Sequence, residues 1–181
     1  QIILGQFYTK INYLITLHQR KYDKLLNIKK SLLEKMFPQN GELIPQIRFK
    51  GFTEDWEQCE LSKKVEFYTG LTYSPLNITD EHGTLVLRSS NVKNGEIILK
   101  DNVYVENNIV NSENVEVGDV IVVVRNGSRE LIGKHAQIKH MMLKTVIGAF
   151  MTGVRYNEAE FLNALLNTQQ FDLEIEKNLG A

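Results

Sequence analysis

Three polar segments of the chain carry side chains that could bind a ligand. They are "LRSSNVKNGEI" (87–97), "VVVRNGSRELIGKHA" (122–136) and "FYTGLTYSP" (67–75). Such side chains bond phosphates and base edges, where Arg or Lys pairs with guanine and Asn with adenine. The same composition also fits solvated turns, because Asn, Ser and Gly are ordinary turn residues. The candidate contacts are Arg88, Ser90, Asn91, Lys93, Arg125, Asn126, Ser128, Arg129, Tyr68, Thr69 and Tyr73.

The residues that could carry catalysis or bind a metal do not form a known constellation. The sequence contains no phosphate-binding Gly-x-x-x-x-Gly-Lys loop, no dinucleotide-binding glycine turn and no Gly-x-Ser-x-Gly elbow. His135 and His140 are placed on an expected hairpin without a cysteine or paired acid at ligand spacing, so we interpret them as surface or turn residues. Cys59 has no evident basic partner, which favours a buried, inert thiol. We therefore expect no catalytic residue, no metal and no cofactor.

Composition bounds the class of protein. The 181 residues suit one domain, or a modest domain with an appendage, and 43% hydrophobic content is enough to bury a core. The net charge of −1 argues against avid nucleic-acid binding by the whole chain, but residues 84–155 carry nine basic against seven acidic side chains. That bias permits a basic face in the middle of the chain. No apolar run is long enough to span a membrane, and the single cysteine fits a reducing compartment, so we expect the cytoplasm.

A long amphipathic helix is predicted for residues 1–37. Apolar residues recur at alternating steps of three and four, which is the seam of a coiled coil, and the seam is broken only at His18 and Lys21. Pro38 ends the pattern. Such a helix is longer than one small domain needs, so its seam is expected to pack on another helix, although folding back on its own domain is the alternative. The seam residues are Leu4, Phe7, Ile11, Leu14, Leu25, Ile28 and Leu32.

Beyond the helix, residues 38–50 are a Pro- and Gly-containing linker and residues 51–181 form a second domain. Short β-branched runs alternate there with turn signals at Asn94-Gly95 and Asn126-Gly127, and residues 115–124 form the clearest strand. Helical stretches are predicted near Leu61 and over residues 158–177. Because strands and helices do not alternate regularly, we predict an α+β fold with a mixed or antiparallel, strongly curved sheet and flanking helices.

Several motifs together resemble the central region of the specificity subunits of type I restriction–modification systems. The first part of the resemblance is a long helix with Leu-His-Gln-Arg-Lys and Lys-Lys…Met-Phe-Pro signatures, followed by Pro…Arg-Phe-x-Gly-Phe…Trp-Glu. In this chain those are Leu17 to Lys21, Lys29-Lys30 with Met36 to Pro38, Pro45, Arg48 to Phe52, and Trp56-Glu57. The later "YTGLTYS", "LRSSNVKNGEI", "VGDVIVVVRNGSRELIGKHA" and C-terminal "EFLNALLNTQQFDLEIEKNLGA" are similar to a target recognition domain of that family.

The resemblance implies a non-catalytic module that reads one half of a bipartite site in double-stranded DNA. In that family, paired helices set the spacing of two recognition domains and dock the modification subunits, through which the restriction subunit joins the assembly. This sequence has one such helix and one such domain, so it is similar to half of a subunit or to a fragment of one. The unpaired seam also predicts a homodimer formed through the helix. The alternative is a helical assembly or dimerisation protein whose domain does not read DNA.

Overall fold

The computed structural model describes residues 1–39 and 41–179, and the chain forms two compact units, Gln1–Glu57 and Gln58–Ala181. The boundary between them follows residue 57, a few residues beyond the stretch predicted as a linker. Each unit is described by itself below. The predicted fold class is confirmed: a long N-terminal helix is followed by a mixed-sheet domain with two C-terminal helices.

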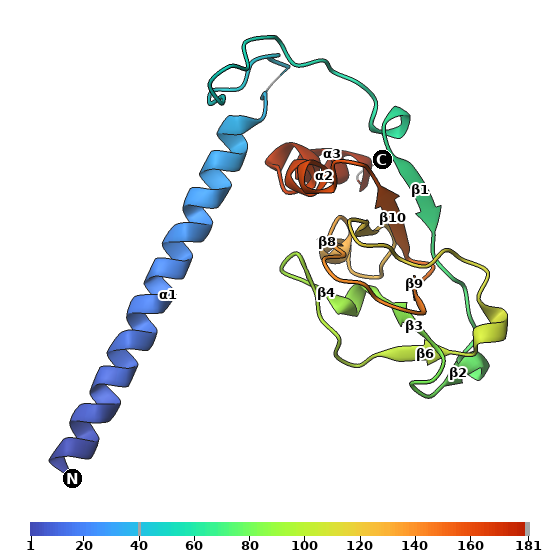
Figure 1. Ribbon diagram of the computed structural model, residues 1–181, viewed down its shortest axis with the longest axis horizontal. Coiled ribbons are helices and arrows are strands. Elements are labelled where there is room, and N and C mark those ends of the chain that lie inside the picture. The colour runs from blue at the N-terminus through green and yellow to red at the C-terminus, as the bar shows by residue number, and fades with distance from the viewer. Residues whose placement is uncertain (40, 180–181) are drawn as a thin grey trace. The chain divides into compact units, whose positions relative to one another are not determined.

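The first unit is dominated by helix α1, Ile2–Met36, drawn in blue in Figure 1. The helix stops where predicted, because Phe37 takes an extended conformation before Pro38. The chain then turns back on the helix end. Ile47 N donates to Lys35 O at 2.9 Å, and the Phe37 ring meets the Trp56 ring edge-on with centroids 5.6 Å apart. These contacts fix the end of α1 and leave its length uncovered, since no residue of α1 is buried.

The second unit contains an antiparallel sheet in the order β1-β10-β7-β8. Its strands are β1 Glu66–Thr69, β10 Met151–Arg155, β7 Val120–Val123 and β8 His135–Gln137. The pairing sets Tyr68 opposite Gly153 and Gly153 opposite Ile121. The Tyr68 ring lies over the position that a Cβ at residue 153 would occupy, so glycine is required there for packing.

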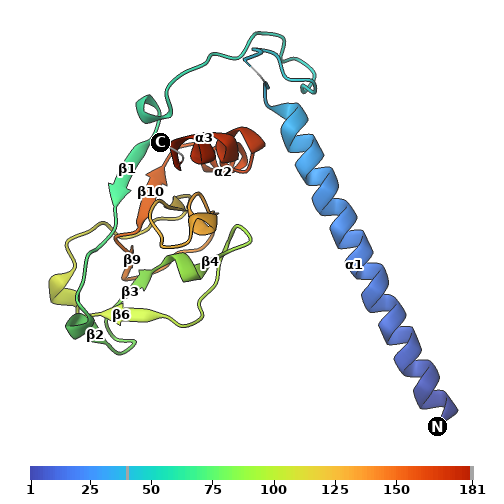
Figure 2. The same cartoon turned by 180° about the vertical axis from the view of Figure 1, so that it is seen from behind.

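A second, mixed sheet has the order β2-β6-β3-β9. Its strands are β2 Ile78–Thr79, β6 Val103–Val105, β3 Thr84–Leu87 and β9 Thr145–Ile147. The β3–β9 pair is parallel and the others are antiparallel. The two views of Figures 1 and 2 both show β9 between β3 and β10. The parallel pair matters for the site, because it brings the carboxyl ends of β3 and β9 to the same edge.

The predicted Asn94-Gly95 hairpin is confirmed. It joins β4 Val92–Lys93 to β5 Glu96–Ile97, and both central residues have positive φ, 53° and 74°. Two adjacent left-handed residues are what a two-residue hairpin turn requires, and Asn and Gly adopt that conformation at low cost.

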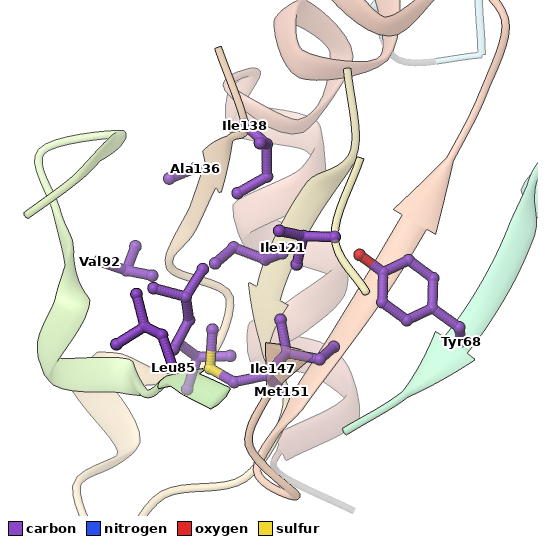
Figure 3. Close-up of a cluster of buried hydrophobic side chains, with 11 residues drawn as sticks. Tyr68, Leu85, Val92, Ile121, Ala136, Ile138, Ile147 and Met151 are labelled. Atoms are coloured by element: carbon purple, nitrogen blue, oxygen red, sulfur yellow. The ribbon is translucent and has the colours of Figure 1, made fainter. Parts of the chain in front are cut away.

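Buried apolar side chains fill the space between the two larger sheets. Figure 3 shows part of this cluster, in which Ile121, Ile147 and Met151 come from β7, β9 and β10. A second cluster joins the outer face of the antiparallel sheet to helix α2, Ala159–Leu166, through Val120, Val154 and Leu162. The domain therefore stacks helices, an antiparallel sheet and a mixed sheet as three layers.

The structure corrects four predictions of local structure. The strand expected at 115–124 covers only Val120–Val123, because the backbone turns at Gly118, whose φ is 101°. The helix expected near Leu61 is a single 3₁₀ turn, Leu61–Lys63. The helix expected at 158–177 is two helices, α2 and α3 Gln169–Leu179, separated at Asn167 and Thr168.

The fourth correction concerns Cys59, which is exposed rather than buried. It lies in an extended segment between Trp56 and Leu61, outside the strands and helices. The apolar residues around it in sequence pack elsewhere: Trp56 on the end of α1 and Leu61 on the α2 side of the antiparallel sheet. The thiol of Cys59 therefore does not join either hydrophobic cluster and stays exposed.

Candidate nucleic-acid interface

The three polar segments found in the sequence meet at one short turn, Gly148–Phe150, which links β9 to β10. Gly148 N donates to Leu87 O at 2.8 Å, where the 87–97 segment begins. Ala149 N donates to Leu71 O at 2.9 Å, within the 67–75 segment. Backbone hydrogen bonds therefore tie two of the segments directly to this turn.

The third segment, residues 122–136, is tied to the same turn through Phe150. Phe150 O accepts hydrogen bonds from Val124 N at 3.0 Å and Arg125 N at 3.2 Å. A side-chain bond then joins two of the polar segments to each other, because Asn126 Nδ2 donates to Ser89 Oγ at 2.9 Å. Three polar stretches far apart in the sequence, residues 69–73, 88–93 and 125–129, thus lie around the turn at 148–150. We name these three stretches and the turn together the 148–150 edge.

The predicted turn at Asn126-Gly127 has a specific cause. Asn126 Oδ1 accepts a hydrogen bond from Ser128 N at 3.0 Å, which closes an Asx turn. The same side chain uses its amide group on Ser89, so Asn126 is half-buried and occupied at both ends. In this conformation it holds Arg125 and Ser128 in place on the edge, and its amide keeps one N–H and one oxygen lone pair for a further contact.

Among the described residues, the basic side chains of the edge form no ion pair with a carboxylate. Arg125 and Arg129 are exposed, and within the described part of the chain neither forms an ion pair. Arg88 is half-buried, with Nη2 donating to Asp101 O at 2.7 Å and Nε without a hydrogen-bond partner among the described residues. Ser90, Lys93, Ser128 and Thr69 are exposed as well. Guanidinium groups without bound carboxylates can pair with phosphate or with guanine.

Three predicted contacts do not lie open on the surface. Tyr68 is buried, and its hydroxyl donates to Asp119 Oδ2 at 2.7 Å. Asn91 is fully buried; its Oδ1 accepts from Arg88 N and its Nδ2 donates to Ile98 O at 3.0 Å. Tyr73 is half-buried against the cluster that contains Leu71 and Val86. Tyr68 and Asn91 have structural roles in the folded domain, because buried polar groups need these internal partners.

A polar group that the sequence motifs did not single out surrounds the buried Asp119, at the opposite end of β7 and β10 from the 148–150 edge. Arg155 Nε and Nη2 donate to Asp119 Oδ1 at 2.9 Å and Oδ2 at 3.0 Å. Asp119 Oδ2 also accepts from Glu116 N at 2.9 Å. The guanidinium carbon lies 5.1 Å from the centre of the Tyr68 ring. We name these residues the Asp119 network; it joins β1, β10 and the loop before β7.

The Asp119 network raises the pKa values of Tyr68 and Arg155. Burial raises the pKa of the Tyr68 hydroxyl far above its ordinary value, and the hydrogen bond to the Asp119 carboxylate raises it further. The hydrogen bond to Asp119 likewise raises the pKa of Arg155. Tyr68 therefore stays protonated and Arg155 charged wherever the domain is folded. An aspartate inside the apolar run "VEVGDVIVVV" was the sequence signal for this network.

Among the residues that the structure describes, no group of three or more His, Cys, Asp or Glu could hold a metal ion. His135 is a half-buried residue of β8 rather than a surface or turn residue, and its ring meets Phe171 of α3 edge-on. No helix formed by the described residues is long and apolar enough to cross a membrane.

Comparison with known sequences finds relatives of one kind. No family model matches the chain. The StySPI type I restriction enzyme specificity subunit of Salmonella potsdam is 26% identical over 106 residues, which are 56% of this chain and 23% of that protein. The EcoKI specificity subunit of Escherichia coli K12 is 27% identical over 101 residues, 54% of this chain and 22% of that protein. This chain is similar to type I restriction enzyme specificity subunits.

Solved structures share the fold. The HsdS subunit from Thermoanaerobacter tengcongensis matches 87% of this chain with a TM-score of 0.58 and 14% identity, over 37% of its own length. A chain of a type I R-M system matches 93% of this chain with a TM-score of 0.62 and 14% identity, over 40% of its length. The resemblance given by the sequence motifs is confirmed, and the chain spans under a quarter of the curated relatives it matches.

Proposed function

We propose that this chain supplies DNA sequence specificity to a type I restriction–modification complex, reading one half of a bipartite target through the 148–150 edge. The observation that carries the proposal is the convergence of three polar segments on one turn, in a chain similar to specificity subunits. Arg125 and Arg129 are exposed and without ion pairs among the described residues, as phosphate or guanine contacts would require. The role is recognition, without catalysis, cofactor or metal.

Within this proposal the predicted contacts other than Tyr73 either contact DNA directly or support the loops and strand that do. The exposed Arg125, Arg129, Ser128, Ser90, Lys93 and Thr69 are the direct DNA contacts, and Arg88 joins them through its half-buried guanidinium. Asn126 and Asn91 shape the two loops, and Tyr68 anchors β1 from the inside. The edge thus combines exposed donors with a backbone that internal hydrogen bonds hold in place.

The helix has a separate role in the proposal. With residues 1–37 as helix, 38–50 as linker and 51–181 as domain, α1 acts as a spacer that docks modification subunits and, through them, the restriction subunit. Its predicted seam residues Leu4, Phe7, Leu14, Leu25, Ile28 and Leu32 are exposed, and Ile11 is half-buried. An uncovered apolar seam fits packing against an equivalent helix of a second copy. We place the assembly in the cytoplasm, where its DNA substrate lies.

The test replaces Arg125 and Arg129 together by alanine in the complex with modification subunits. Loss of two phosphate or base contacts is expected to weaken binding of the target duplex by at least about tenfold. If both contact phosphate, the slope of log affinity against log salt becomes shallower by about 0.9 for each. The methylation motif is found by methylome sequencing. Binding to duplexes with and without this motif, measured over a series of salt concentrations, gives the affinity and the salt slope.

Lys64→Ala is the matched control, because Lys64 is an exposed cation that precedes β1, at the opposite end of that strand from Thr69. It should leave affinity and salt slope unchanged. A wild-type complex that binds all duplexes equally, including the methylation motif, would contradict the proposal.

The alternative function is helical assembly without DNA reading, and the uncovered seam of α1 is the observation that favours it. It predicts that the chain captures modification subunits while the double arginine variant leaves the methylation pattern of cells intact. A changed or lost pattern in that variant, with capture retained, selects DNA recognition instead.

A further inference from the structure

We propose that Phe150 is a specificity-determining residue of the 148–150 edge, whose ring contacts the C5-methyl group of a thymine in the major groove. The inference rests on the proposed DNA-reading function and deepens it. Phe150 was not among the residues that sequence motifs selected. Phe150 is 59% exposed, next to the polar loops of the edge and to Val124, which is 41% exposed.

Backbone hydrogen bonds hold the turn that carries Phe150. Phe150 O accepts from two amides of the 122–136 segment, Val124 N and Arg125 N. The next residue, Met151, is the buried start of β10, and its amide donates to Gly148 O at 2.8 Å. Met151 is buried in the core, whereas the side chain of Phe150, in the turn before it, is 59% exposed.

The turn cannot relax to hide the ring. Gly70 and Gly148 lie backbone against backbone, so closely that a Cβ at residue 70 would overlap Gly148 O. Leu71 N also donates to Ile147 O at 2.7 Å just before the turn. Because the backbone of this turn is already held in place, little backbone freedom is lost when Phe150 makes a contact.

The neighbours of Phe150 suggest which part of DNA it meets. Arg125 donates its backbone N–H to the Phe150 carbonyl, and its side chain is exposed. The next residue, Asn126, ties the adjoining loop to Ser89 through a side-chain hydrogen bond. Arg reads guanine in the major groove, where thymine alone presents an apolar methyl group. A ring placed between such donors would contact that methyl group and discriminate a T·A pair from its alternatives.

The experiment combines a protein change with a DNA change. In the complex with modification subunits, Phe150→Ala is compared with wild type on duplexes in which each thymine of the target half-site is replaced singly by deoxyuridine. We expect one position at which losing the methyl group lowers wild-type binding roughly fourfold. Phe150→Ala should bind the unmodified target about tenfold more weakly and show no further loss on that deoxyuridine duplex.

Two controls separate a DNA contact from a structural effect. Leu143→Ala removes an 80% exposed apolar side chain just before β9, at the opposite end of that strand from Phe150, and should leave binding unchanged. Phe150→Leu keeps an apolar contact and should restore most of the affinity. Because the ring is exposed, denaturant unfolding of Phe150→Ala should match wild type.

The outcomes are distinct. Wild-type discrimination that survives unchanged in Phe150→Ala overturns this inference and leaves the proposed function standing. In that case the ring acts as a wedge between base steps or as general packing. Failure of the wild-type complex to discriminate any duplex overturns the proposed function itself.

Discussion

Helices α1 and α2 differ in the burial of their leucine side chains. Leu25 on α1 is 54% exposed, whereas Leu162 on α2 is 1% exposed and packs on the antiparallel sheet. The 35-residue α1 buries none of its side chains, while the eight-residue α2 buries Ala159, Leu162 and Leu166. Most helical stability in proteins comes from packing an apolar face. The difference indicates that the domain is stabilised from within, whereas the apolar residues of α1 add little to the stability of this chain through burial.

The largest test of the domain's internal stability is Asp119→Ala. Asp119 is 1% exposed, and its removal leaves the Arg155 guanidinium and the Tyr68 hydroxyl without their shared acceptor. Breaking a buried pair in this way costs about 3–5 kcal/mol, which urea unfolding of the chain measures. Asp119→Asn keeps a hydrogen-bonding side chain and should cost less. A loss below about 1 kcal/mol for alanine would mean that the network carries little of the stability.

The second test applies the same substitution to the two helices. Leu162→Ala should lower the free energy of unfolding by about 3 kcal/mol, because it opens a cavity between α2 and the sheet. Leu25→Ala should change it by less than about 0.5 kcal/mol in the free chain, since the side chain is already in water. Leu25→Ala should instead weaken association, measured by sedimentation or by capture of modification subunits. Similar losses of folding stability for both variants would contradict the comparison.

The same contrast explains what sequence patterns could predict. The end of α1, the Asn94-Gly95 hairpin and the mixed sheet follow from local signals: Pro38, two residues tolerant of positive φ, and β-branched runs. Two of the corrected strand and helix bounds depended on single local features, the turn at Gly118 and the break at Thr168. Thr168 is buried, and its hydroxyl donates to Leu165 O at 2.7 Å, so it closes α2 before α3 begins.

The candidate site was predictable in composition but not in geometry. Sequence patterns selected the segments that carry Arg88, Arg125 and Arg129. They could not separate the exposed Arg125 from the buried Asn91, because both are polar residues close to short β-branched runs. The sequence did not predict Phe150 as a site residue, because "IGAFMTG" is a mostly apolar run that does not show which side chain is exposed. Only the pairing of β9 with β3 and of β10 with β7 places that ring beside the polar loops.

The smallest expected effect concerns His135, which packs against Phe171 of α3 with ring centroids 5.8 Å apart. Burial lowers the pKa of His135 from 6.5, although the Gly133 carbonyl and Asp172 oppose the shift. Below pH 6.5 the unfolded imidazole therefore binds a proton that the folded one does not, and stability falls as the pH falls. His135→Gln should reduce the loss of unfolding free energy between about pH 7 and about pH 5. His18→Gln is the matched control, because that imidazole is exposed on α1. An unchanged pH dependence in His135→Gln would show that docking of α3 does not depend on a neutral His135.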